Sequence, residues 1–170
     1  MTGTKSNNAV RTARVSDAEA LVGVFQESWR FAYQGIIPHL QLERIIERRG
    51  ADWWACQVKQ APKSLLVVDV GGRVAGYANF GVARGRSVQR GEIYELYLAP
   101  DYHGMGLGEG LFEASRHALD MRCLKGLIVW ALSENTSAMN FYWGRGGWPT
   151  ACKNERIGGT ALEKIAFTWD

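Results

Sequence analysis

The chain has 170 residues, 46% of them hydrophobic and 22% charged, and its formal net charge is +3. This size and composition suit one compact domain with a hydrophobic core. The small charge argues against a nucleic-acid-binding protein, and no apolar run approaches the roughly 20 residues that a membrane-spanning helix requires.

The N-terminal segment, MTGTKSNNAV, lacks the apolar core of a secretory signal. We expect residues 1–8 to be a flexible N-terminus and residues 9–170 to form a single domain. The cysteines Cys56, Cys123 and Cys152 are odd in number and lack the spacing of metal ligands. We therefore expect no metal site, no disulfide framework and a reducing, cytoplasmic location.

The N-terminal half of the chain reads as one strand followed by helical segments. Ser16-Asp17-Ala18-Glu19 has the form of a capping box, which marks the start of a helix. Pro38 suits the first turn of the next helix, which ends near Gly50. The elements expected here are a strand at Val10–Val15, helices at 21–32 and 38–50, and a short helical piece at 52–59.

The C-terminal half alternates between strands and helices. Gly71-Gly72 is expected to form a tight hairpin turn, Asn135 can cap a helix, and a Gly158-Gly159 turn precedes the last strand. The elements expected here are strands at Ser64–Val70, Arg73–Val82, Glu92–Leu98, Leu127–Leu132 and Ala161–Trp169, and helices at Gly106–Met121 and Thr136–Trp143. Without the short piece at 52–59, and with one further strand ahead of the Gly158-Gly159 turn, the order is β-α-α-β-β-β-α-β-α-β-β.

A glycine-dense loop between a strand and a helix is the most informative feature of the sequence. The strand ends at Pro100, and Gly104, Gly106 and Gly108 follow directly ahead of an apolar helical pattern. Such a loop presents several backbone N–H groups, together with the positive end of a helix dipole, to one anion. It lacks the Gly-Lys-Ser/Thr of a Walker loop, and it does not supply the GxGxxG of a Rossmann unit.

This segment resembles the acetyl-CoA-binding motif of the GNAT-type N-acetyltransferases, Q/R-x-x-G-x-G/A after a strand reading L-Y-V-x-P. The strand end is Leu96-Tyr97-Leu98-Ala99-Pro100, and the loop is His103-Gly104-Met105-Gly106-Leu107-Gly108. His103 stands where the family usually has Gln or Arg, and Met105 stands where Lys or Arg is frequent. Backbone donors can still hold a diphosphate, but we expect weaker affinity than in relatives with a cationic loop.

A second motif resembles the same family. The segment NTSAMNFYWGRGGW, residues 135–148, is similar to N-x-x-A-x-x-F-Y-x-x-x-G, and its matching residues are Asn135, Ala138, Phe141, Tyr142 and Gly146. Two motifs in the right order extend the resemblance over nearly the whole chain. At subfamily level, the pattern resembles at most the phosphinothricin-acetyltransferase-like branch.

The resemblance implies a single α/β (α+β) domain with a mixed, mostly antiparallel sheet and helices on both faces. Two central strands, Glu92–Leu98 and Leu127–Leu132, would splay apart and hold the pantetheine arm of acetyl-CoA between them. Asn135 could bind the pantetheine amides or simply cap its helix. The residues expected to bind acetyl-CoA are Tyr97, Leu98, His103, Gly104, Met105, Gly106, Leu107, Gly108 and Asn135.

The family motif also implies catalytic roles. Tyr142 would be the general acid that protonates the departing sulfur, although its spacing alone favours simple packing. Glu92 and Glu95 are the candidate bases, and relatives with a glutamate at the start of this strand favour Glu92. Because they lie three residues apart, they should point to opposite faces of a regular strand unless a bulge intervenes. Either could also be an ordinary solvated strand residue.

The acceptor side is read from the loop between the first two helices. Trp29 and Tyr33 could form an apolar wall around the acceptor, although core packing explains Trp29 equally well. We expect the enzyme to transfer acetyl from acetyl-CoA to a primary amine of a small molecule, by direct attack in a ternary complex. The alternatives are N-terminal or lysine acetylation of proteins or peptides, and a non-catalytic CoA-sensing module. We expect a homodimer that binds neither nucleic acid nor membranes.

Overall fold

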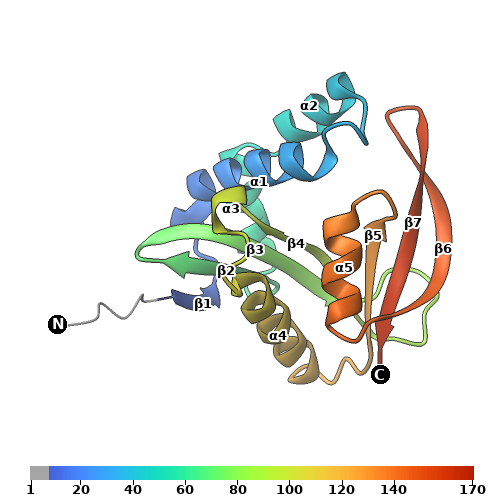
Figure 1. The fold of residues 1–170 in the computed structure, drawn as a ribbon. Coiled ribbons are helices and arrows are strands. Elements are labelled where there is room, and N and C mark those ends of the chain that lie inside the picture. The colour runs from blue at the N-terminus through green and yellow to red at the C-terminus, as the bar shows by residue number, and fades with distance from the viewer. Residues whose placement is uncertain (1–7) are drawn as a thin grey trace.

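The protein folds around one mixed sheet of seven strands, with helices on both faces (Figure 1). The computed structural model describes residues 8–170. The strands are β1 (Asn8–Thr12), β2 (Leu65–Val70), β3 (Arg73–Val82), β4 (Gly91–Leu98), β5 (Leu127–Leu132), β6 (Trp148–Ile157) and β7 (Thr160–Trp169). The helices are η1 (Val15–Asp17), α1 (Ala18–Tyr33), α2 (His39–Glu47), α3 (Ala51–Gln60), η2 (Pro100–Tyr102), α4 (Leu107–Asp120) and α5 (Thr136–Gly144).

The strands lie in the order β1-β2-β3-β4-β5-β7-β6. Every neighbouring pair is antiparallel except β4 and β5, which are parallel. The expected mixed, mostly antiparallel sheet with helices on both faces is therefore confirmed. Within residues 8–170, none of the helices is both long and apolar enough to cross a bilayer.

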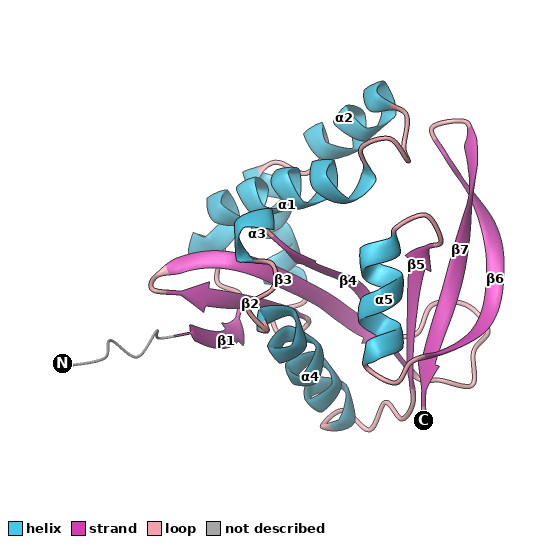
Figure 2. Cartoon of the chain, viewed as in Figure 1, coloured by secondary structure: helices cyan, strands magenta, loops and turns pink. Residues whose placement is uncertain are grey.

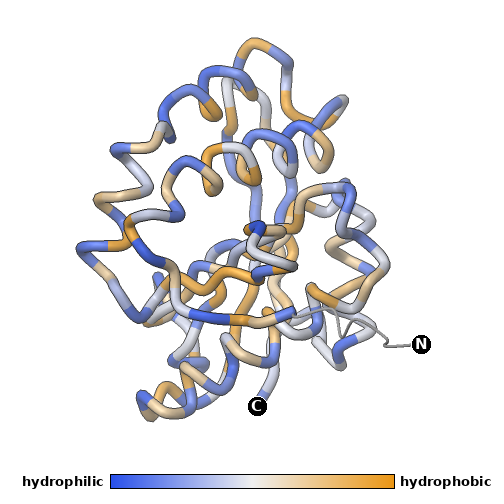
Figure 3. Tube along the Cα trace, turned by 90° about the vertical axis from the view of Figure 1, so that its left-hand side faces the viewer, coloured by the Kyte–Doolittle hydropathy of each residue, from blue (hydrophilic) through white to orange (hydrophobic). Residues whose placement is uncertain are grey.

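Two hydrophobic cores fill the two faces of the sheet. Hydrophilic and hydrophobic residues alternate along the coiled parts of the chain (Figure 3), and α1, α2, α3 and α4 each bury residues at helical spacing. Helices α1, α2 and α3 cover one face, and α4 and α5 cover the other (Figure 2). The α1-side core includes Leu21, Phe25, Trp54, Tyr77, Leu132 and Leu162. The α4-side core includes Ile93, Leu111, Phe112, Val129, Phe167 and Trp169.

The start of the chain differs from the sequence-based expectation. The expected strand at 10–15 is wrong in its bounds, because β1 runs from Asn8 to Thr12. The expected flexible segment 1–8 lies outside the described residues except for Asn8, which begins this strand. The expected capping box is also wrong, since α1 begins at Ala18 and its N-cap is Asp17. Asp17 makes no cap hydrogen bond because its carboxylate is engaged elsewhere.

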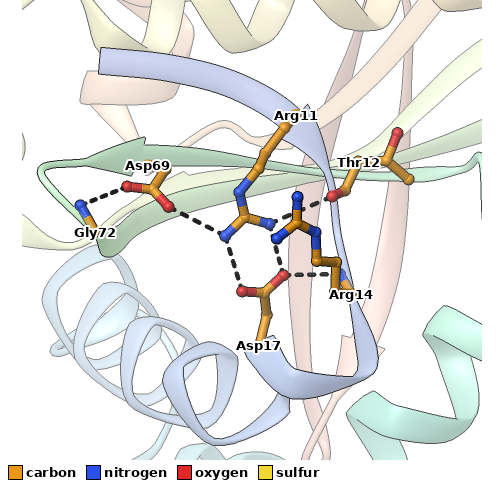
Figure 4. A network of polar contacts seen from close by, with 6 residues as sticks. All are labelled: Arg11, Thr12, Arg14, Asp17, Asp69 and Gly72. Atoms are coloured by element: carbon orange, nitrogen blue, oxygen red, sulfur yellow. Dashed lines mark hydrogen bonds and ion pairs between the residues drawn. The ribbon is translucent and has the colours of Figure 1, made fainter. Parts of the chain in front are cut away.

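That engagement is an ion-pair network around Arg11 (Figure 4). The two terminal guanidinium nitrogens of Arg11 donate to Asp17 at 2.8 and 2.9 Å, and one of them also donates to Asp69 at 3.1 Å. The Arg14 amide donates to the same Asp17 carboxylate at 2.7 Å. These hydrogen bonds, chiefly those from Arg11, hold the pKa of Asp17 below its ordinary value. The network joins β1, the start of α1 and the β2–β3 hairpin.

Strand β4 carries two irregularities that shape the centre of the molecule. Its register with β3 shifts, because Ile93 lies opposite Phe80 while Glu95 lies opposite the adjacent Asn79. The extra residue, Tyr94, is a β-bulge, and it reverses the alternation of side chains along the strand. Ile93 and Leu96 consequently both pack in the α4-side core.

It follows that Glu92 and Glu95 lie on the same face of the sheet, the face opposite to α4. On a regular strand the two side chains would point to opposite faces, and the bulge is the exception for which the sequence-based expectation allowed.

The second irregularity is a fork between the two central strands. Strands β4 and β5 pair only at Gly91↔Leu127, Glu92↔Ile128 and Ile93↔Val129. Beyond this point, which we call the fork, β4 continues to Leu98 without a partner on that side. The expected splaying of the two central strands is present.

Candidate active site

The fork opens into a cleft of about 590 Å³. Its lining comes from segments far apart in the sequence: the end of α1, the second half of β4, the glycine loop, β5, and α5 with the residues that flank it. Strand β4 thus contributes backbone as well as side chains. The cleft collects the unpaired edge of a strand, the beginning of a helix and several polar side chains in one place.

The glycine loop delivers the N-terminus of α4 to this cleft. Gly104 and Gly106 have φ angles of 75° and 76°, a left-handed conformation that favours glycine. Gly106 is the N-cap of α4, and the Gly110 amide donates to its carbonyl at 3.3 Å. The amides of the three residues between them therefore have no partner within the helix. Gly104, Gly106, Leu107 and Gly108 all line the cleft.

Gly108 has a second, steric role. A Cβ atom at this position would lie 3.3 Å from the Phe141 ring. The absence of a side chain therefore lets the first turn of α4 approach α5 closely.

The two loop residues that depart from the family motif are His103 and Met105, and neither is the lysine or arginine that the family frequently has. His103 lines the cleft, but its Nε2 lies 3.1 Å from the Leu98 carbonyl oxygen, and its ring packs edge-on against Phe31. Met105 is exposed and does not line the cleft.

Arg145 brings a positive charge to this end of the cleft, and sequence reasoning missed it. It lies just after α5, lines the cleft, and its Nη1 is 2.5 Å from Glu109 in the first turn of α4. Its Nε is buried and has no hydrogen-bond partner among residues 8–170. Its carbonyl accepts a hydrogen bond from Trp169 Nε1 at 2.9 Å, which fixes the backbone. In the family motif this position is an unspecified x, so the motif gave no signal for it.

The backbone of β4 presents donors to the cleft. The Ala99 amide donates to Ala75 of β3 at 2.8 Å. Because N–H groups alternate in direction along a strand, the Tyr97 amide also points to β3, whereas those of Leu96 and Leu98 point to the cleft. Both residues were expected to bind acetyl-CoA. Leu98 turns its backbone amide to the cleft, whereas Tyr97 lines the cleft with its amide turned to β3.

Tyr142 lies in the cleft wall with its ring in the α4-side core. It is 6% exposed and packs against Phe141, Phe167 and Trp169, with centroids 5.3, 5.9 and 6.0 Å away. Burial raises the pKa of its hydroxyl well above the ordinary value. The hydroxyl makes no hydrogen bond to the described part of the chain, and it remains protonated at neutral pH.

The two candidate bases occupy different environments. Glu95 lines the cleft, and its Oε1 is 2.6 Å from Arg49 Nη1. Glu92 is 2% exposed and does not line the cleft. Its carboxylate accepts hydrogen bonds from the Arg84 amide at 2.7 Å and from Arg84 Nη2 at 2.9 Å. Glu92 therefore ties down the β3–β4 connection, and Glu95 is the one that faces the cleft.

Of the two residues expected to bind the acceptor, only Tyr33 lines the cleft. Its hydroxyl is hydrogen-bonded to that of Tyr97, and burial raises its pKa to about 12. Trp29 does not line the cleft, because its ring packs between Phe25 and Tyr33 with centroids 5.0 and 4.8 Å away.

Asn135 has the capping role, one of the two roles that the sequence left open, and it also lies at the cleft. Its Oδ1 accepts a hydrogen bond from the Ala138 amide at 3.2 Å. The side chain therefore caps α5 at the edge of the cleft.

Comparison with known proteins agrees with this geometry. The profile of the acetyltransferase (GNAT) family matches residues 21–146. An uncharacterised N-acetyltransferase of Bacillus subtilis is 28% identical over 162 residues, covering 94% of this chain and 91% of that protein. Spermidine N(1)-acetyltransferase of Thermoplasma acidophilum is 20% identical over 142 residues, covering 81% of this chain and 86% of that protein. The structure of an N-acetyltransferase from Thermoplasma acidophilum in complex with coenzyme A superposes with a TM-score of 0.75 at 19% identity, covering 94% of this chain and 98% of that one.

Proposed function

The chain belongs to the acetyltransferase (GNAT) family, and from this premise we propose that it acetylates a primary amine of a small molecule by direct attack in a ternary complex. As a family member it is an acetyl-CoA-dependent N-acetyltransferase. The observation that carries the finer proposal is that one cleft brings together the unpaired edge of β4, the N-terminus of α4 and Tyr142.

The residues of the cleft fit acetyl-CoA. The free amides at the start of α4 and the cation of Arg145 suit a diphosphate. The Leu96 amide and the carbonyls of Leu96 and Leu98 suit the amides of an extended pantetheine arm, which would take the place of the missing strand pairing. Bound there, acetyl-CoA would supply an acetyl thioester to the amine.

Three groups of the chain would then divide the chemistry. Glu95 accepts the first proton of the ammonium group, directly or through water, because only the free amine is nucleophilic. The Leu98 amide donates to the carbonyl oxygen as that oxygen gains negative charge. The C–N bond forms as the C–S bond breaks, and Tyr142 passes a proton to the sulfur while its oxygen takes the second proton of the nitrogen. This relay suits a phenol whose raised pKa keeps it protonated.

A contact at the far end of the β6–β7 hairpin favours a small acceptor over a polypeptide. Ile157 and Leu162 of the hairpin pack in the same core as Ile37 and Leu42, beside α2. At the hairpin tip, a Cβ on Gly158 would overlap the Gln41 side chain. This contact closes the side of the sheet on which the acceptor approaches, where a peptide would need an open groove.

The proposed function is tested by an amine panel. The full chain is incubated with acetyl-CoA and individual small amines or N-terminal and lysine peptides, and the release of free CoA is followed. We expect turnover of at least one small amine and none of the peptides. Turnover of peptides would favour the protein-acetylation alternative, and binding of CoA without turnover of any amine would favour the sensing module.

The two glutamates give a matched pair of variants. Glu95→Gln should lower kcat/KM at neutral pH by roughly 100-fold, the usual contribution of a general base. Glu92→Gln should leave the rate of the folded protein intact and lower the free energy of unfolding by about 1–3 kcal/mol, because it weakens charge-assisted hydrogen bonds to Arg84. Steady-state kinetics and urea denaturation measure the two effects, and the reverse pattern would move the base to Glu92.

We also propose that the protein forms a homodimer in the cytoplasm. Strand β6 is an edge strand that is exposed almost throughout. The exposed ring of Trp148, the first residue of β6, stacks on that of Trp143 with the ring centroids 5.9 Å apart. An exposed edge with large apolar side chains is suited to a partner, and sedimentation velocity that finds only monomer at micromolar concentration would contradict the dimer.

A further inference from the structure

Two aromatic side chains at the fork each make a cation–π contact with a basic side chain. Tyr94 and Trp130 are the residues that directly follow the last β4–β5 pair, and both line the cleft. The Arg84 guanidinium lies 4.1 Å from the centroid of Tyr94, and Lys153 Nζ lies 4.2 Å from that of Trp130. Rings in this position hold a cation beside the cleft in a defined place.

These cations lie on the acceptor side of the sheet. Lys153 and Lys164 are directly opposite one another in the β6–β7 pair. Because Ile165 and Phe167 pack in the α4-side core, the alternation along β7 points Lys164 to the other face. This face is the one on which Glu95 lies, and it is opposite to the α4 N-terminus and Arg145. The cations are therefore placed for the acceptor and not for the diphosphate of acetyl-CoA.

Arg84, Lys153 and Lys164 form a cationic cluster whose charges are incompletely balanced by carboxylates. Arg84 is paired with Glu92 at 2.9 Å, and Lys164 is paired with Glu155. Lys153 has no carboxylate within ion-pair distance among the residues that the structure describes. Burial lowers the pKa of Lys164, and repulsion from Lys153 and Arg84 lowers it further, against the opposing effect of Glu92. An anion placed among the three cations would relieve this repulsion.

We propose that the acceptor is an amine that also bears an anionic group, a carboxylate or a phosphate, which Lys153 and Arg84 bind over Trp130 and Tyr94. Its amine then faces Glu95 in the cleft. This inference rests on the proposed function and narrows its substrate class. A polycation such as spermidine, the substrate that names the Thermoplasma relative, would be repelled by the same cluster.

Matched pairs of acceptors test the inference with the full-length protein. We compare α-amino acids with their carboxamides, phosphoethanolamine with ethanolamine, and spermidine as the cationic case, at fixed acetyl-CoA. The anionic member of at least one pair should have roughly tenfold higher kcat/KM, as expected for a charge-assisted contact. Because the amine of a carboxamide is less basic than that of the acid, amine basicity would favour the amide, so a preference for the acid must come from the charge.

A charge variant then assigns the preference to the cluster. Lys153→Met should abolish the preference by raising KM for the anionic acceptor, with KM for acetyl-CoA unchanged, and Lys153→Arg should retain it. Lys59→Met, which removes an exposed lysine on α3, is the matched control and should change nothing. Lys153 is exposed on the edge strand, so the variants should fold, and thermal melting checks this.

The outcomes separate the two proposals. Equal use of acids and amides, a preference for spermidine, or a preference that survives in Lys153→Met would overturn the inference while leaving the proposed function intact. Absence of turnover with every amine would overturn both. The amino-acid and phosphoethanolamine pairs distinguish a carboxylate from a phosphate.

Discussion

Tyr142→Phe should lower kcat for acetyl transfer by roughly 100-fold or more, while KM for acetyl-CoA stays within about twofold. The ring of Phe keeps the contacts with Phe141, Phe167 and Trp169, so only the hydroxyl is lost. Without it, the sulfur leaves as an unprotonated thiolate and the second proton of the nitrogen has no nearby acceptor. Steady-state kinetics with a saturating amine measure the effect.

Two controls accompany this variant. Tyr102→Phe changes a tyrosine of η2 that does not line the cleft, and it should behave as the wild type. The pH profile gives the second control. Burial raises the pKa of Tyr142, so the acid stays protonated as pH rises, and the wild-type rate should show no falling limb from this group below pH of about 10. An unchanged kcat in Tyr142→Phe would remove Tyr142 from the mechanism.

Arg145→Ala should weaken acetyl-CoA binding by roughly 10- to 100-fold, the usual effect of losing charge-assisted hydrogen bonds to a phosphate. The glycine loop of this chain has His103 and Met105 where relatives carry cations; the His103 ring contacts the Leu98 carbonyl, and Met105 does not line the cleft. Arg145 is the cation that remains at the start of α4, where it is paired with Glu109. Calorimetric titration with acetyl-CoA measures the dissociation constant directly.

The Arg145 prediction has its own controls. Arg145→Lys keeps the charge and should recover part of the affinity. Arg44→Ala removes an exposed arginine of α2 and should leave the dissociation constant unchanged. Glu109→Gln releases Arg145 from its ion pair, so it should bind acetyl-CoA at least as tightly as the wild type. If Arg145→Ala bound acetyl-CoA with wild-type affinity, the backbone amides alone would account for diphosphate binding.

Local patterns were enough to predict the parts of the fold that depend on local chemistry. Gly71 and Gly72 identified the β2–β3 hairpin, because a tight turn needs positive φ at these positions. The glycine loop identified the start of α4 within one residue. The family resemblance predicted the sheet and its splayed strands, and these are confirmed.

Features that depend on pairing across the sheet were not predictable from the sequence. The bulge at Tyr94 is visible only in the register of β4 against β3, and it decides which face Glu95 occupies. Strand β6 has almost no buried residue, so no alternation marks its bounds. The sequence around Asp17 has the form of a capping box. In the structure, the Asp17 carboxylate is instead hydrogen-bonded to Arg11, and nothing in the sequence indicates this contact between residues six positions apart.

The fork has a thermodynamic consequence for the whole molecule. In the described part of the chain, the pairing of β4 with β5, which joins the β1–β4 half of the sheet to the β5–β7 half, covers three residue pairs, so main-chain hydrogen bonding along these two strands is incomplete. The pantetheine arm, in the position that we propose for it, would act as a surrogate strand that joins the two halves. Folding and ligand loading are then linked equilibria, and ligand at 100 times its dissociation constant adds about 2.7 kcal/mol to the stability of the folded state. The gap that makes room for chemistry thus also makes the resistance of this protein to unfolding depend on the concentration of its own co-substrate.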